Sequence, residues 1–241
     1  MKQNIDICLS SHLIDLFDIN ESTVVVIDVL RATTAICEAF KNGVKTIIPV
    51  SDIHEAQAFK KKGYIVAAER DGKVLDFADF GNSPHNFSVE RVKDKTIVYS
   101  TVNGVPALQK VENAKQIFVA SFLNLNAIVD FLSKSNRDIL LLCAGWKGNF
   151  NLEDTLLAGA IVEKLNKNSK INPANDAVIA AVDLWRIYGE NLQERAEEFF
   201  QIKRLKNLRI TDKLSDYFTL NSCDYIPIYE NGVILNLNSK I

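Results

Sequence analysis

A unit of strand, polar turn, helix and second strand recurs along this chain, and this recurrence constrains the fold more than any other feature. In the first unit a β-branched run covers Val24–Ile27, a helical pattern covers Thr33–Phe40, and a second strand pattern covers Lys45–Val50. β-branched residues at every position of a strand are typical of strands buried on both faces. Asn42 and Gly43 supply the residues that commonly end a helix.

The second unit repeats this order further along the chain. Thr96–Tyr99 reads as a strand, a polar turn begins at Ser100, and Lys115–Ala120 reads as the closing strand. Aligning Asp28 with Ser100 brings the two units into register at an offset of roughly 70 residues, which indicates an internal duplication.

A third strand and helix follow the two units and complete the predicted fold class. Asp138–Cys143 reads as a strand and Leu152–Ile161 as an amphipathic helix. The sequence therefore predicts an α/β protein with three α/β/α layers and a largely parallel, mixed sheet, formed by residues 1–241 as a single domain. Ligands of such folds bind beyond the carboxyl ends of the strands, so we expect Asp28, Ser100 and Cys143 on one rim.

Polar turns at the strand ends predict what binds at this rim. Four turns rich in glycine, hydroxyl and amide groups cover Asp28–Thr34, Ala78–Pro84, Ser100–Gly104 and Cys143–Gly148. Backbone N–H groups in tight turns and at helix starts favour negative charge, so the turns predict one anion-binding site assembled from several loops.

Charge and composition exclude other classes. The formal net charge is −2 and the pI is about 6.0, which argues against a nucleic-acid binder. The basic runs at Lys60–Lys62 and Lys203–Lys206 are interpreted as solvated helix faces. No apolar run reaches the roughly 20 residues that span a bilayer, so we expect no membrane partner. The oligomeric state stays open, a homo-oligomer included.

The cysteines predict neither a disulfide framework nor a zinc site. Cys8, Cys37, Cys143 and Cys223 lie far apart, without a C-x-x-C pair or a histidine at zinc-ligand spacing. The first residues run into an alternating segment that lacks the apolar core of a signal peptide. We therefore expect a cytoplasmic protein with reduced thiols.

Each candidate side chain also has a purely structural interpretation. Asp28 either caps a helix or acts in the site, beside an arginine and hydroxyls suited to phosphate oxygens. Glu69 and Arg70 form either an exposed charged turn or a pair that holds a cation and an anion. Glu153 and Asp154 either favour the positive end of their helix or face the rim. Cys143 is either a small buried residue or a nucleophile.

Six ordered motifs together resemble those of the 2-phosphosulfolactate phosphatase (ComB-like) family. They are Val26–Thr34, Glu69 with Arg70, Phe80–Pro84, Ser100–Gly104, Cys143–Gly145, and Glu153 and Asp154 followed by Ala158 and Gly159. The resemblance implies an α/β/α fold and magnesium-dependent hydrolysis of the small anion (R)-2-phospho-3-sulfolactate to 3-sulfolactate and phosphate, a step towards coenzyme M in methanogens.

The resemblance also implies roles for individual residues. The catalytic positions would be Asp28, Arg31, Glu69, Arg70 and Cys143. The substrate-binding positions would be Thr33, Thr34, Asn82, Ser83, Ser100, Thr101, Asn103 and Gly145. The Mg²⁺ ligands would come from Asp28, Glu69, Glu153 and Asp154.

The chain departs from the family pattern in its third motif. Where the family usually carries two further hydroxyls and an arginine, this chain has Val102, Val105 and Pro106. It also has Phe77 or Ala78 where the family usually carries a glycine before the Gly-Asn-Ser-Pro turn. These changes leave the identity of the acidic substrate more open than the reaction.

Two other functions remain as alternatives at this point. In a cysteine hydrolase of the isochorismatase type, Asp28 would activate Cys143, although no lysine partner is evident. In a non-catalytic relative, the same turns would bind a small anion without turning it over.

Overall fold

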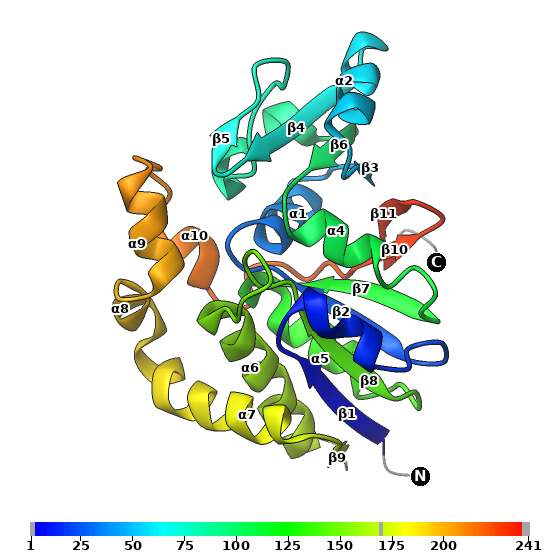
Figure 1. Cartoon of the computed structure of the whole chain (residues 1–241), viewed down its shortest axis with the longest axis vertical. Coiled ribbons are helices and arrows are strands. Elements are labelled where there is room, and N and C mark those ends of the chain that lie inside the picture. The colour runs from blue at the N-terminus through cyan, green and yellow to red at the C-terminus, as the bar shows by residue number, and fades with distance from the viewer. Residues whose placement is uncertain (1–2, 169–170, 238–241) are drawn as a thin grey trace.

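A mixed sheet of eleven strands runs through the protein, and helices cover both of its faces (Figure 1). The computed structural model describes residues 3–168 and 171–237. The strand order is β5-β4-β6-β3-β11-β10-β7-β2-β8-β1-β9. The predicted α/β/α class with a largely parallel, mixed sheet is confirmed.

The sheet consists of two parallel halves joined by a hairpin. The first half comprises β7 (Gln116–Ala120), β2 (Thr23–Ile27), β8 (Ile139–Cys143), β1 (Gln3–Cys8) and β9 (Ile171–Pro173). The second comprises β3 (Thr46–Pro49), β6 (Thr96–Ser100) and β4 (Ile65–Arg70), with the short β5 (Lys73–Val74) antiparallel at its edge. The joining hairpin comprises β10 (Pro227–Glu230) and β11 (Val233–Asn236).

The hairpin sets the two halves in opposite directions along the sheet. β10 pairs antiparallel with β7 and β11, and β11 pairs antiparallel with β3. Neighbouring strands are rotated by about 20–25°, so the twist accumulates over the strands between β2 and β6. The carboxyl ends of both halves reach one cleft, which Asp28 after β2 and Thr101 after β6 both line. The expected rim is therefore shared between two half-sheets.

Strand pairing agrees with the predicted duplication. The first unit is β2, α1 (Ala32–Lys41) and β3, and the second is β6, α4 (Gly104–Gln109) and β7. β2 pairs with β7 and β6 pairs with β3, so the first strand of each unit pairs with the last strand of the other. The strand order around the β11-β10 hairpin is consequently symmetrical.

Alternate residues of β2 supply two different cores. Val25 and Ile27 pack in the apolar cluster shared with α5 (Leu125–Leu132) and α6 (Leu152–Asn168). Val24 and Val26 pack in the cluster on the opposite face, with α1 and α4. All four side chains are fully buried, as the β-branched run predicts.

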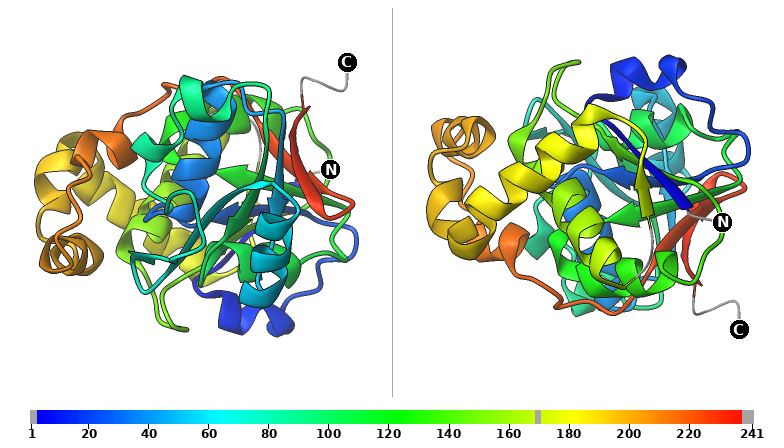
Figure 2. Two further views of the ribbon diagram at one scale, coloured as in Figure 1. Left: turned by 90° about the horizontal axis from the view of Figure 1, so that it is seen from above. Right: turned by 90° about the horizontal axis from the view of Figure 1, so that it is seen from below.

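A helical arm lies between β9 and β10 along the chain and projects beside the sheet, in yellow and orange (Figure 2). It contains α7 (Asp176–Tyr188), α8 (Leu192–Ala196), α9 (Phe200–Asn207) and α10 (Leu214–Phe218). The pattern over residues 192–208 predicts one helix, and this prediction is wrong. Phe199 has an extended backbone and is buried against Tyr188 and Phe218, which separates α8 from α9.

The remaining elements cover edges and connections. They are the helices α2 (Ile53–Lys61) and α3 (Val89–Val92) and the 3₁₀ turns Ser11–Leu16, Pro84–Asn86, Phe122–Asn124 and Gly189–Asn191. All four cysteines are free and buried. Within the described ranges, no helix combines the length and the apolar character needed to cross a membrane.

Candidate active site

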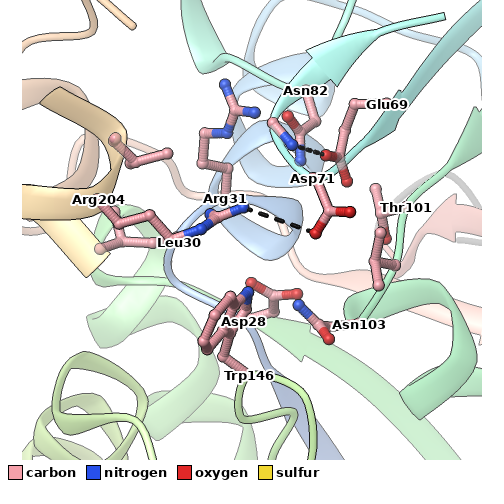
Figure 3. A pocket seen from close by; sticks show the side chains of 13 residues that line it. Asp28, Leu30, Arg31, Glu69, Asp71, Asn82, Thr101, Asn103, Trp146 and Arg204 are labelled. Atoms are coloured by element: carbon pink, nitrogen blue, oxygen red, sulfur yellow. Dashed lines mark hydrogen bonds and ion pairs between the residues drawn. The ribbon is translucent and has the colours of Figure 1, made fainter. Parts of the chain in front are cut away.

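Loops at the carboxyl ends of β2, β4, β6 and β8 meet helix α9 around one cleft (Figure 3). Six of its lining residues belong to the predicted site: Asp28, Arg31, Glu69, Asn82, Thr101 and Asn103. The others are Leu30, Asp71, Gly72, Val102, Trp146, Arg204 and Leu205. The structure thus brings together Glu69 and residues from all four polar turns, the fourth turn contributing Trp146.

Asp28 lines the cleft and is 5% exposed. Its backbone N–H donates to Thr33 Oγ1 at 3.1 Å, and its Oδ1 lies 3.5 Å from the backbone N of Ala32. A Cβ added at Gly104 would lie 2.9 Å from Asp28 Oδ2, so glycine is needed for this close approach. Burial raises the pKa of Asp28 to about 7, and the negative charge of Glu69 adds to this rise.

Arg31 is held by residues from two other segments. Its Nη1 donates to Ser83 Oγ at 2.7 Å and lies 3.6 Å from Asp212 Oδ2. Ser83 thus positions the guanidinium and does not itself line the cleft. The predicted hydroxyls Thr33 and Thr34 serve their own loop, because Thr33 Oγ1 accepts from Asp28 and Thr34 Oγ1 donates to the carbonyl of Val29 at 2.8 Å.

Glu69 and Arg70 point to different environments. Glu69 lines the cleft, where its Oε2 accepts a bond of 2.7 Å from the backbone N–H of Gly72. Arg70 is not among the lining residues and donates instead to the carbonyl oxygens of Ser51 and Glu69 and to Ser100 Oγ at 3.1 Å. Arg70 therefore ties together the ends of β3, β4 and β6.

Three oxygen-bearing side chains of the cleft suit a hard cation. Asp28 and Glu69 contribute buried carboxylates, and the buried Oδ1 of Asn82 has no hydrogen-bond partner. Mg²⁺ prefers oxygen ligands and usually takes only one or two carboxylates, together with water and substrate phosphate. Within the described residues no three His, Cys, Asp or Glu side chains form a ready-made metal cluster. The donor set of two carboxylates and one amide oxygen fits Mg²⁺.

Asp154 and Glu153 lie outside this cleft. Asp154 accepts from the backbone N–H of Val29 at 2.9 Å and of Gly145 at 3.2 Å, so its carboxylate joins the loops after β2 and β8. Glu153 lines a neighbouring cavity together with Gln201, and its buried Oε1 has no partner. Burial raises the pKa of Glu153 to about 7 and that of Asp154 well above its usual value.

Cys143 is fully buried, and burial raises the pKa of its thiol well above the usual value. A buried thiol with a raised pKa is a poor nucleophile, so the geometry gives the cysteine-hydrolase hypothesis no support.

Three other predicted site residues serve the structure of their loops. Ser100 is fully buried, and Thr101 Oγ1 accepts from the backbone N–H of Val105 at 3.2 Å. Gly145, at φ +69°, could not carry a side chain because its Cβ would lie 2.4 Å from the carbonyl oxygen of Asn149.

Sequence reasoning missed three charged or aromatic side chains of the cleft and a fourth that contacts one of its arginines. Asp71, Trp146 and Arg204 line the cleft, and Asp212 contacts Arg31. The solvated-face interpretation of Lys203–Lys206 is wrong for Arg204, whose side chain is only 22% exposed. No local pattern marks Arg204 or Asp212, because both reach the site through the arm.

Comparison with known proteins identifies the family. The model of a family described as 2-phosphosulpholactate phosphatase matches residues 8–232. A probable 2-phosphosulfolactate phosphatase of Caldanaerobacter subterraneus subsp. tengcongensis is 37% identical over 221 residues, which cover 90% of this chain and 91% of the relative. One of Thermotoga maritima is 39% identical, with 88% and 91% covered, and one of Clostridium perfringens is 33% identical, with 98% of each covered. The chain belongs to the 2-phosphosulpholactate phosphatase family.

Proposed function

We propose that this protein is a Mg²⁺-dependent phosphatase that hydrolyses 2-phospho-3-sulfolactate to 3-sulfolactate and phosphate. The observation that carries the metal requirement is the buried, unpartnered Oδ1 of Asn82 in the same cleft as two buried carboxylates. A buried acceptor without a donor is costly, and a bound cation would satisfy it. The family to which the chain belongs supports the reaction and the substrate.

Asp28, Glu69 and Asn82 would hold the ion. When bound, Mg²⁺ supplies positive charge that stabilises the phosphoryl oxygens as negative charge develops during transfer. Burial of Asp28 and Glu69 close to each other disfavours two negative charges without a cation, as the raised pKa of Asp28 indicates.

Arg31 would bind and orient the phosphate. Arg31 lines the cleft, and its Nη1 lies 2.7 Å from Ser83 Oγ and 3.6 Å from Asp212 Oδ2, which fix the position of the guanidinium. A planar guanidinium can donate two parallel hydrogen bonds to phosphate oxygens. Thr101 and Asn103 lie on the loop opposite and would help to position the ester.

Metal titration tests this proposal. Phosphate release from 2-phospho-3-sulfolactate is measured on protein treated with a chelator and then supplied with increasing Mg²⁺. We expect little release without the ion and saturable activation with it. Release that needs no metal and stops on thiol alkylation would favour a cysteine hydrolase, whereas binding of the ester without release would favour a non-catalytic anion-binding protein.

A further inference from the structure

Helix α9 places a second arginine in the cleft. Arg204 and Leu205 both line it, and Figure 3 shows the Arg204 side chain extending toward Asp71. The guanidinium carbon lies 5.0 Å from the ring centroid of Trp146. Contact with an aromatic ring limits the orientations of a guanidinium, so Trp146 preorganises Arg204.

The guanidinium of Arg204 has donors to spare. Across residues 3–168 and 171–237 its side chain donates no hydrogen bond, and its charge partner is Asp71, whose Oδ1 lies 3.9 Å from Nη2. That distance is too long for a hydrogen bond. Asp71 also lies 3.1 Å from Lys147 Nζ, and its side chain is 66% exposed. Exposed ion pairs contribute only about 0–1 kcal/mol, so an anion with better geometry can displace Asp71.

The two arginines of the cleft differ in how they are satisfied. Arg31 has a hydroxyl and a buried carboxylate as partners, whereas the charge partner of Arg204 within the described residues is an exposed carboxylate at 3.9 Å. The proposed substrate carries a phosphate, a carboxylate and a sulfonate on a three-carbon chain. Arg31 can bind the phosphate. The carboxylate and the sulfonate then remain, and a second cationic side chain is needed to bind one of them.

We infer that Arg204 binds the second oxyacid group of the substrate and thereby determines specificity for phosphoesters that carry one. This inference rests on the proposed function. Asp71 and that acid group would then compete for the guanidinium of Arg204.

The roles of Arg204 and Asp71 predict opposite effects of mutation. If the pair only held the arm against the sheet, Arg204→Gln and Asp71→Asn would weaken binding alike. If Asp71 competes with the substrate, Asp71→Asn should tighten binding of the product 3-sulfolactate about threefold, and Arg204→Gln should weaken it about tenfold. Binding is measured by titration calorimetry, so the result does not depend on turnover.

Steady-state kinetics on three esters identify the group. The esters are 2-phospho-3-sulfolactate, 2-phospholactate, which lacks the sulfonate, and ethyl phosphate, which lacks both other acid groups. Arg204→Gln should lower kcat/KM for the first ester about tenfold relative to ethyl phosphate, mainly through KM. If kcat/KM falls equally for 2-phospholactate, Arg204 binds the carboxylate. If kcat/KM falls for 2-phospho-3-sulfolactate alone, Arg204 binds the sulfonate.

Arg186→Gln is the matched control, because Arg186 lies in the same arm, on α7, and pairs with Glu163 at 3.0 Å. It should change neither binding nor kinetics. Equal losses on all three esters, or weaker 3-sulfolactate binding in Asp71→Asn, would overturn the inference. If the wild-type protein hydrolyses none of the esters, the proposed function fails, and the binding titrations alone then decide on Arg204.

Discussion

Asp212 Oδ2 lies 3.6 Å from Arg31 Nη1 and joins the helical arm to the loop after β2. The Asp212 side chain is 2% exposed. Its other oxygen lies 3.1 Å from His85 Nδ1, and the hydroxyl of Tyr217 donates to Oδ2. The buried carboxylate of Asp212 thus contacts an arginine, a histidine and a tyrosine. Because Asp212 belongs to the arm, the orientation of Arg31 depends on the position of the arm.

Asp212→Asn should raise KM several-fold more than it lowers kcat, because the guanidinium that binds phosphate loses its charged partner. The effect should be less than additive with Arg31→Lys, since both changes act on one contact. Asp216→Asn is the control, because Asp216 bonds the backbone N–H of Lys213 outside the cleft. Full additivity in this double-mutant cycle would show that Asp212 does not act through Arg31.

Asp28→Asn should abolish Mg²⁺-dependent phosphate release while the protein stays folded, because it removes a charge without changing side-chain size. Titration calorimetry with Mg²⁺ and circular dichroism check the two halves of this prediction. Asp183→Asn, with a side chain that is 61% exposed on α7, provides the control. Activity that persists within a few-fold in Asp28→Asn would show that Asp28 only caps α1.

The metal-free protein should become less stable as the pH rises from about 4 to about 7. Burial raises the pKa of Asp28 from 3.8, and that of Glu153 from 4.5, to about 7 in the folded state. The unfolded chain therefore releases these protons at a lower pH than the folded protein does. Between about pH 4 and pH 7 the folded state binds more protons than the unfolded state, so the free energy of unfolding falls as the pH rises. The effect is on the order of a few kcal/mol.

Thermal unfolding at pH 5 and pH 8, with and without Mg²⁺, measures this dependence. Without metal, Tm should be lower at pH 8. Added Mg²⁺ should raise Tm more at pH 8, where the carboxylates it needs are ionised. A metal-free Tm that rises between the two pH values would contradict the assignment.

Cys143→Ser should keep most of the phosphatase activity. The thiol is fully buried and does not line the cleft, so it has no access to the substrate. Alkylating reagents should likewise leave the folded wild-type protein active, because its four cysteines are all buried. Complete loss of activity in a folded Cys143→Ser protein would restore the cysteine-hydrolase hypothesis.

Val102 and Val105 should respond differently to threonine, although both depart from the family pattern. Val102 lines the cleft, whereas Val105 belongs to α4, is 1% exposed and packs in the core. Val105→Thr should destabilise the fold by about 1–3 kcal/mol, because it buries a hydroxyl. Val102→Thr should leave stability nearly unchanged and alter KM. Denaturant unfolding and kinetics on both variants separate the two outcomes.

Local patterns in the sequence were sufficient for much of the fold. The β-branched run over Val24–Ile27 depends on adjacent residues, and the structure has the strand β2 there. The polar turns after β2 and β6 likewise determined that Asp28 and Thr101 lie at strand ends. Strand burial and turn conformation depend on neighbouring residues, so one sequence reveals them.

Only the tertiary structure decided how these loops share one cleft. The hairpin of β10 and β11 reverses one half of the sheet, and the break at Phe199 turns α9 toward the cleft. Arg204 and Asp212 reach the site through that path, while Arg70 and Asp154 bond to backbone and neighbouring loops away from it. Side chains distant along the chain meet only after the elements pack, and no local pattern encodes such contacts.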